Sequence, residues 1–211
     1  MYSSFEKLPK DKKEKIVKVC IEEFGIHGYK KTSTNKIVEK AGISKGLLFH
    51  YFGNKKNLYL YMINYAVQYF SKLFKNFIEE AHEDDIFIRL KKWGLFKIKV
   101  FSQKPKMYKF LTKAFLSPPK DLENEIQQIY HKIYSNNIDI LVKDINVEKF
   151  RNNINIDKAI ELLLISLDGI TNKYLKEYFG NEDKILYDME SIIKDFDECL
   201  EILKWGFYEK K

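Results

Sequence analysis

AGISKGLLFHYFGNKKNLY, residues 41–59, is the stretch of this sequence that decides the fold. Its Gly42 is suited to a tight turn, and Ser44 can cap a short helix over about residues 45–51. Just before it, Thr34 is the expected N-cap of another short helix, in which Ile37, Val38 and Ala41 face inward over about two turns. Two short helices joined by a glycine-containing turn indicate a helix-turn-helix.

The rest of the chain also has helical spacing of apolar residues, and few segments alternate with the period of two that is typical of strands. We therefore predict an all-α protein with a three-helix helix-turn-helix DNA-binding domain, followed by a six-helix domain for ligand binding and dimerisation. The predicted helices cover about residues 11–27, 34–41, 45–51, 55–81, 85–103, 105–116, 120–143, 157–179 and 185–208. The predicted domains are residues 1–54 and 55–211, with helix 55–81 connecting them.

The positive charge of this protein is concentrated near its N-terminus. The chain has 211 residues and a formal net charge of +7. Residues 1–58 contain 13 Lys and 6 acidic residues, whereas residues 59–211 contain 24 basic and 24 acidic residues. This asymmetry is typical of a polyanion-binding N-terminal part on a neutral body. From charge alone, a solvated basic face without a partner remains an equal alternative.

Several functional classes lack their sequence signatures. No apolar run reaches the roughly 18 residues of a membrane span, and no apolar stretch follows the charged N-terminus as in a secretory signal. We therefore predict a cytoplasmic protein that does not bind membranes. The two cysteines are widely separated and suggest buried thiols. Glycine-rich phosphate loops and the common hydrolase and zinc motifs are missing from the sequence, so we predict no enzyme, metal site or cofactor.

The chemistry of the helix-turn-helix points to double-stranded DNA. In this motif the second helix enters the major groove, and its N-terminal residues reach base edges. Lys45 can donate to a guanine or a phosphate, and Gly46 has no side chain to keep DNA away. Taken singly, Lys45 could be solvated and Tyr51 could be core, but the spacing and local charge together favour DNA binding. The predicted DNA-contacting residues are Thr32, Ser33, Thr34, Ser44, Lys45, Gly46, Leu47, His50, Tyr51 and Lys55.

Residues 24–59, FGIHGYKKTSTNKIVEKAGISKGLLFHYFGNKKNLY, resemble the DNA-binding domain of the tetracycline-repressor (TetR) family. The positions that carry the resemblance are Phe24, Gly28, Tyr29, Thr32, Thr34, Ile37, Ala41, Gly42, Ile43, Ser44, Gly46, Phe49, His50, Phe52 and Lys55. One departure is Phe49, where many members have a tyrosine whose hydroxyl can bind phosphate. Tyr51 is a candidate to supply that hydroxyl instead.

The resemblance implies a homodimer in which the last two helices of each subunit form the interface. It also implies a ligand pocket among the preceding helices and a ligand-driven change in the separation of the DNA-binding heads. The residues predicted for the dimer interface are Leu163, Leu167, Ile170, Ile193, Phe196 and Leu200. Those predicted for the ligand site are Trp93, Phe96, Tyr108, Phe115, Tyr130 and Tyr134. For both groups, packing in the core of one chain is the alternative.

The sequence thus predicts a ligand-responsive transcription regulator, specifically a repressor that binds a palindromic operator as a homodimer. A small apolar or aromatic effector is expected to release it from DNA. The alternative is an architectural DNA-binding protein of low sequence specificity that responds to no ligand. The neutral body of about 150 residues argues against this alternative, because an architectural DNA-binding protein does not need so large an additional domain.

Overall fold

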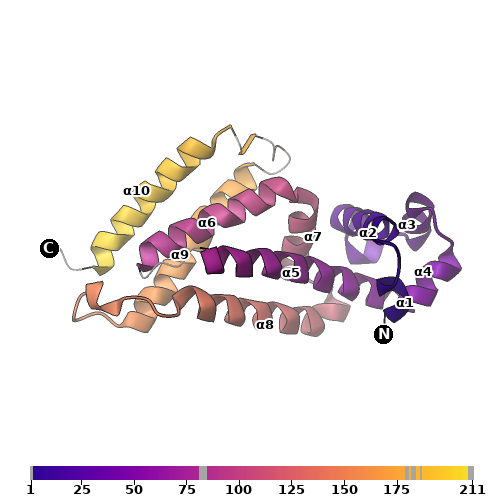
Figure 1. Cartoon of the computed structure of the whole chain (residues 1–211), viewed down its shortest axis with the longest axis horizontal. Helices are drawn as coiled ribbons and strands as arrows, with labels where there is room; N and C mark the ends of the chain where they lie inside the picture. The colour runs from indigo at the N-terminus through magenta and orange to yellow at the C-terminus, as the bar shows by residue number, and fades with distance from the viewer. Residues whose placement is uncertain (1, 81–84, 179–180, 182–183, 186, 209–211) are drawn as a thin grey trace. The chain divides into compact units, whose positions relative to one another are not determined.

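The computed structural model describes residues 2–80, 85–178, 181, 184–185 and 187–208. The secondary-structure elements of this part of the chain are all helices (Figure 1). The α-helices are α1 (Ser3–Glu6), α2 (Lys10–Lys31), α3 (Thr34–Ala41), α4 (Lys45–Phe52), α5 (Lys55–Glu80), α6 (Ile86–Gln103), α7 (Pro105–Leu116), α8 (Glu123–Val142), α9 (Ile156–Glu177) and α10 (Met189–Phe207). Two short 3₁₀ helices, η1 (Lys120–Leu122) and η2 (Val147–Lys149), flank α8.

The predicted all-α class is confirmed, and each predicted helix has a counterpart in the structure. The main addition is α1, which has only four residues and is therefore too short to produce a periodic apolar pattern. Helix α2 extends past its predicted end, but Gly28 interrupts it with a φ of 70°. That left-handed conformation is the one in which glycine has no steric penalty, so Gly28 does end the regular helix.

The chain divides into two compact units. The first contains Met1–Leu73 and Lys106–Tyr134, and the second contains Phe74–Pro105 and Ser135–Lys211. The predicted domain boundary between residues 54 and 55 falls inside the first unit. Helix α5 runs without a break across that boundary and contributes residues to both units.

The first unit has one continuous hydrophobic core, to which α1–α5, α7, η1 and α8 all contribute. Its largest fully buried side chains are Phe5, Phe24, Phe52, Phe110, Ile16, Ile37, Leu48, Leu58, Met62 and Ile63. Each fully buried side chain of this size stabilises the fold by about 1.5–3 kcal/mol relative to exposure. The core lies beneath the helix-turn-helix and holds it in place.

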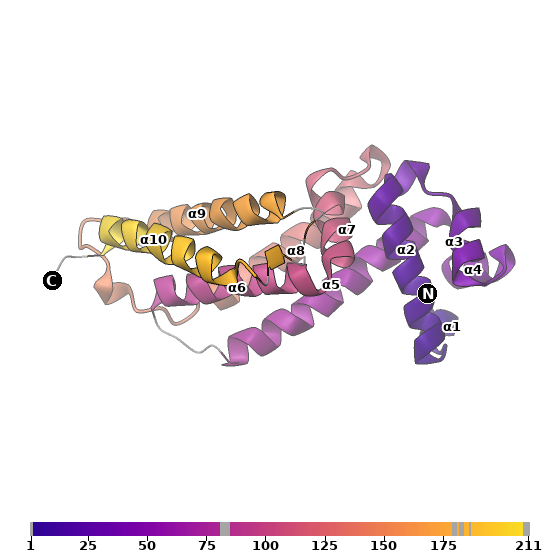
Figure 2. The same ribbon diagram turned by 90° about the horizontal axis from the view of Figure 1, so that it is seen from above.

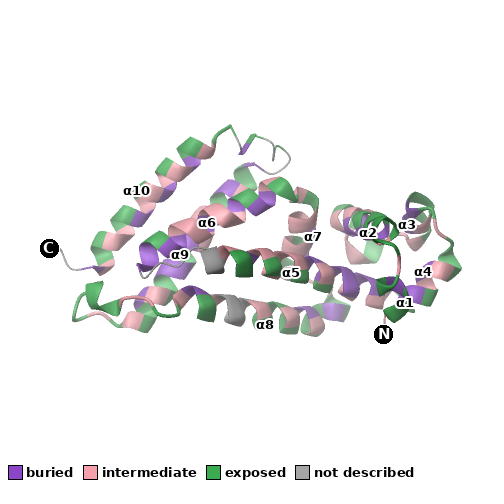
Figure 3. Ribbon diagram, in the orientation of Figure 1, coloured by how far each residue is buried: buried purple, intermediate pink, exposed green. Residues whose placement is uncertain are grey.

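The second unit is built on α6, α9 and α10, each of which contacts the other two (Figure 2). Buried and exposed residues alternate along α10, as the amphipathic pattern of its sequence predicts (Figure 3). The buried Arg89 of α6 donates hydrogen bonds to the carbonyl oxygens of Leu141 and Lys143, at 2.9 and 2.5 Å. Among the described residues, no helix is both long and apolar enough to cross a membrane.

Candidate nucleic-acid interface

Helices α3 and α4 form a helix-turn-helix, as the sequence predicts. Gly42 ends α3 with a φ of 71°, and its N–H and that of Ile43 both donate to the carbonyl of Val38. Ser44 then caps α4, because its hydroxyl oxygen accepts a hydrogen bond from the Leu47 N–H at 3.1 Å. The N-cap of α3 is Ser33 rather than Thr34, which is already the first helical residue.

Helix α4 is hereafter called the recognition helix. Its N-terminal end is open to solvent. Ser44, Lys45 and Gly46 are exposed, and Leu47 is half-buried. Within the described part of the chain, the ammonium group of Lys45 has no ion-pair partner, and the same holds for the exposed Lys36 of α3. These two cations are therefore available to an external anion.

Gly46 is not required by the packing of the protein itself. A Cβ atom built there would meet only the hydroxyl oxygen of Ser44, at 4.0 Å, and the backbone of Gly46 is helical. A glycine inside a helix costs about 0.5–1 kcal/mol relative to alanine. The packing within the chain therefore gives no reason for a glycine at this exposed position of the recognition helix.

Replacing Gly46 by alanine is expected to raise the melting temperature slightly and to weaken DNA binding. The first effect follows from helix propensity, and the second from a methyl group placed where we predict a close approach of DNA. Thermal unfolding followed by circular dichroism and titration of a labelled operator duplex would measure both effects. Equal or tighter DNA binding by this variant would contradict the proposed close approach.

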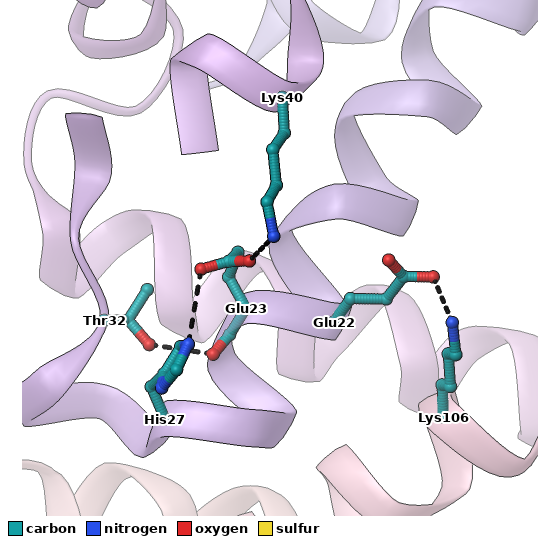
Figure 4. Close-up of polar contacts among 6 residues, drawn as sticks. All are labelled: Glu22, Glu23, His27, Thr32, Lys40 and Lys106. Carbon is teal, nitrogen blue, oxygen red and sulfur yellow. Dashed lines mark hydrogen bonds and ion pairs between the residues drawn. The ribbon is translucent and has the colours of Figure 1, made fainter. Parts of the chain in front are cut away.

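A buried carboxylate joins α2 to α3, the helix that precedes the recognition helix (Figure 4). The Glu23 side chain is only 1% exposed, and its Oε1 accepts a hydrogen bond from Lys40 Nζ at 2.5 Å. This bond raises the pKa of Lys40 above its ordinary value. The other carboxylate oxygen lies 3.7 Å from His27 Nε2 and has no hydrogen-bond partner among the described residues. Glu23 thus anchors the last turn of α3, directly before the Gly42 turn.

Thr32 belongs to this internal network and not to the DNA-facing surface. Its side chain is buried, and its hydroxyl donates to the Glu23 carbonyl oxygen at 3.0 Å (Figure 4). The Gly28 carbonyl oxygen, at 2.6 Å, is a second acceptor for the same hydroxyl. The predicted phosphate contact through this hydroxyl is therefore wrong. Thr32 instead secures the chain between α2 and α3, while the neighbouring Ser33 and Thr34 remain partly accessible.

Tyr51 and Lys55 are also more internal than predicted. Tyr51 is 7% exposed, and its ring lies 5.5 Å from that of Phe5. Most of this side chain therefore belongs to the hydrophobic core, which was the alternative to DNA contact. Lys55 Nζ donates to the Lys30 carbonyl at 3.1 Å and lies over the Tyr29 ring. Burial lowers the pKa of Lys55. Its ammonium group is thus already engaged within the protein, whereas His50 is exposed as expected.

Sequence reasoning missed Glu23 and Lys36. Glu23 had a detectable signal, because it lies in the inward-facing register of α2, three and seven residues after Cys20 and Ile16. An acidic residue on an apolar stripe indicates a buried carboxylate that needs a cation. Lys36 had no distinguishing signal, since the same pattern places many lysines on solvated helix faces.

The predicted ligand-site aromatics belong to separate groups. In the second unit, the rings of Trp93 and Phe96 are stacked at 5.4 Å. In the first unit, Phe115 contacts Tyr130 at 5.2 Å, and Tyr108 contacts Phe70 at 5.8 Å. None of the five is fully buried, so each retains accessible surface. The sixth, Tyr134, has a side chain outside the described residues. The ligand site stays a prediction.

Four of the six residues predicted for the dimer interface lie in the core of a single chain. These are Leu163, Leu167, Phe196 and Leu200, whose exposed fractions are 1, 1, 0 and 5%. Side chains so buried have almost no surface left for a second copy, so their assignment is corrected to intrachain core. The reason is that α6 packs against α9 and α10, and its Gly94 lies close to Leu167 and Phe196. Ile170 and Ile193 are half-buried and remain available.

Comparisons with known proteins identify both parts of the chain. Residues 16–62 match the model for bacterial regulatory proteins of the tetR family, and residues 84–208 match the model for the tetracyclin repressor-like C-terminal domain. The regulator QacR of Staphylococcus aureus is 30% identical over 129 residues, which cover 59% of this chain and 57% of QacR. The regulator YxaF of Bacillus subtilis is 32% identical over 74 residues, or 35% of this chain and 37% of YxaF. These alignments thus span only about half, or less, of each relative.

Solved structures share the fold over nearly the whole chain. A TetR family transcriptional regulator from Chloroflexus aurantiacus has a TM-score of 0.70 at 20% identity, and the match covers 98% of both chains. FadR from Bacillus subtilis, solved in complex with stearoyl-CoA, has a TM-score of 0.63 at 16% identity and covers 92% of this chain and 98% of its own. With a helix-turn-helix at one end and a helical domain matched over residues 84–208, this chain belongs to the TetR family of DNA-binding transcription regulators.

Proposed function

We propose that this protein is a repressor that binds a palindromic operator as a homodimer and dissociates when a small effector binds. The observation that carries the proposal is the exposed N-terminal end of the recognition helix. There Lys45 has no ion-pair partner among the described residues, and a Cβ atom at Gly46 would meet only the Ser44 hydroxyl oxygen. A lysine ammonium group next to a glycine suits the major groove, because the glycine lets the helix backbone come close and the ammonium can donate to base edges. The protein is expected to act in the cytoplasm, where the DNA lies.

A homodimer is proposed because a single helix-turn-helix contacts only a few base pairs, and a two-fold dimer reads a palindrome across successive grooves. Helices α9 and α10 carry exposed large apolar residues that suit such an interface. They are Leu162, Ile165, Ile202 and Trp205, with exposed fractions of 53, 60, 75 and 46%. We assign the dimer interface to this set, in place of the four buried residues predicted from the sequence.

The effector is proposed to be apolar or aromatic, because the partly exposed aromatic side chains offer little charge. FadR, which shares this fold, carries stearoyl-CoA in its crystal structure, so the fold can accommodate a ligand with a long apolar acyl chain. In the first unit, α7 contacts α2 through the Lys106–Glu22 ion pair at 2.9 Å (Figure 4). The two helices also meet at Phe110, whose ring lies 6.4 Å from that of Phe24. A displacement of α7 by the effector would therefore act directly on the scaffold of the helix-turn-helix.

The proposal is tested by selecting bound sequences from a random duplex pool at a salt concentration near physiological. We expect enrichment of one palindrome, with half-sites about one helical turn apart. Retention of DNA that depends on salt but enriches no sequence would instead support the architectural alternative. The enriched duplex then serves as the probe for an effector screen, in which a small apolar compound should release the protein.

Lys45→Ala is expected to lower affinity for the enriched duplex by about 1–3 kcal/mol and to reduce discrimination against other sequences. Lys72→Ala is a matched control, since Lys72 is an exposed lysine of α5 and the substitution removes the same charge. Competition titrations with operator and scrambled duplexes measure both quantities. Unchanged operator affinity after Lys45→Ala would remove this residue from the base-reading role.

A further inference from the structure

The first residues of the chain, which precede the match to the family model at residue 16, are built into the core of the first unit. Phe5 of α1 is completely buried. Its ring lies 4.7 Å from that of Phe52 and 5.5 Å from that of Tyr51, both at the C-terminal end of the recognition helix. It also makes an edge contact with Tyr61 of α5, at 5.3 Å. Phe5 therefore fills the space between the recognition helix and α5.

Polar contacts fasten the same segment to α5 and α2. The Tyr2 hydroxyl donates to the Asn57 carbonyl at 3.5 Å, and the Tyr2 ring lies 4.9 Å from that of Tyr61. The Glu6 carboxylate accepts hydrogen bonds from the Tyr61 hydroxyl and from Lys13 Nζ. Burial alone would raise the pKa of Glu6, but these two hydrogen bonds outweigh it and lower the pKa below its ordinary value.

The recognition helix has only eight residues, so its two ends move together. At a rise of about 1.5 Å per residue, Lys45 lies roughly 10 Å along the helix axis from Phe52. A change of tilt at the packed end therefore shifts the end that faces DNA. Hydrogen bonds to base edges are directional and are lost on such a shift, whereas phosphate contacts depend mainly on charge.

We propose that residues 2–8 are a positioning element for the recognition helix, with Phe5 as the anchor, and that they set how strongly the protein prefers its operator over other DNA. This inference rests on the sequence-specific binding proposed above. It assigns to this segment a role in specificity, in addition to its contribution to stability.

The test compares full-length variants by their affinity for the selected operator duplex and for a scrambled duplex of equal length. Phe5→Ala removes the anchor, and Phe5→Leu keeps an apolar side chain in its place. Phe87→Ala is the matched control, because Phe87 is a phenylalanine buried to a similar degree in the second unit. Measurements are made at a temperature at which circular dichroism shows each variant to be folded.

Phe5→Ala is expected to weaken operator binding by about tenfold or more, as expected for one lost base contact, while affinity for scrambled DNA changes by less than about twofold. Phe5→Leu should recover most of the operator affinity, and Phe87→Ala should lower stability without changing the ratio of the two affinities. If Phe5→Ala does not fold, Tyr2→Ala is used instead, with the same expected pattern and a smaller effect.

The outcomes separate the two proposals. If the wild-type protein shows no preference for any duplex, the proposed function fails and this inference fails with it. If the wild type prefers its operator and the variants of residues 2–8 retain the full preference, the inference alone is wrong and the segment serves stability only. A parallel loss of affinity for both duplexes would also contradict a role in positioning.

Discussion

Ile165→Glu combined with Trp205→Glu is expected to convert the protein to a monomer and to lower its affinity for the palindromic operator by about 100-fold or more. Both side chains are exposed on a single chain, at 60 and 46%, on α9 and α10 respectively. A two-fold interface uses the same patch on both subunits, so each substitution would place two unpaired charges in the interface. An unpaired buried charge costs several kcal/mol, which is enough to prevent association.

Sedimentation velocity would measure the association state, and titration of the selected palindrome would measure the affinity. Leu116→Glu combined with Ile26→Glu is the matched control. These two residues are 78 and 67% exposed and lie in the first unit, on α7 and α2. The control variant should remain a dimer. A double α9–α10 variant that still sediments as a dimer would exclude this face as the interface.

Gly94→Ala is expected to destabilise the second unit by about 1–3 kcal/mol, the usual cost of overpacking. A Cβ atom at Gly94 would lie 2.3 Å from Phe196 Cε1 and 3.0 Å from Leu167 Cδ1. Both of these side chains are themselves buried, at 0 and 1% exposure, so neither can move aside freely. The gain in helix propensity, at most about 1 kcal/mol, offsets only part of this cost.

Thermal unfolding would measure the loss as a decrease in melting temperature of about 2–4 °C per kcal/mol for a chain of this length. Gly25→Ala is the control, because a Cβ atom there meets Phe110 Cβ at an ordinary 3.7 Å. Adding Phe196→Leu to Gly94→Ala should cost less than the sum of the two single substitutions, because the smaller side chain relieves the clash. Strict additivity would contradict direct contact between residues 94 and 196.

The recognition helix and its turn were predictable because their signals are local. The φ of 71° at Gly42 is a conformation that glycine adopts at low cost, and Ser44 caps a helix through bonds to residues only a few positions away. The resemblance to the TetR family depends on this same stretch. For the same reason, the all-α class and most helix limits followed from apolar periodicity within each segment.

The roles of individual side chains were less predictable, because periodicity shows that a face is buried but not what buries it. The apolar stripes of α9 and α10 were assigned to a second copy, whereas α6 of the same chain covers Leu167 and Phe196. Only the three-dimensional packing shows that Gly94 permits this close contact. The apolar residues left for contact with a partner are then the exposed ones of α9 and α10, which include Ile165 and Trp205.

The sequence by itself determined the all-α class, the helix-turn-helix and the concentration of positive charge around it, since all three arise from residues close together along the chain. Only the tertiary structure decided that Thr32 and Tyr51 face inward and that Phe5 supports the recognition helix from 47 positions away in the sequence, at Phe52. These assignments depend on contacts between distant segments, and such contacts form when the helices pack together rather than when each helix folds.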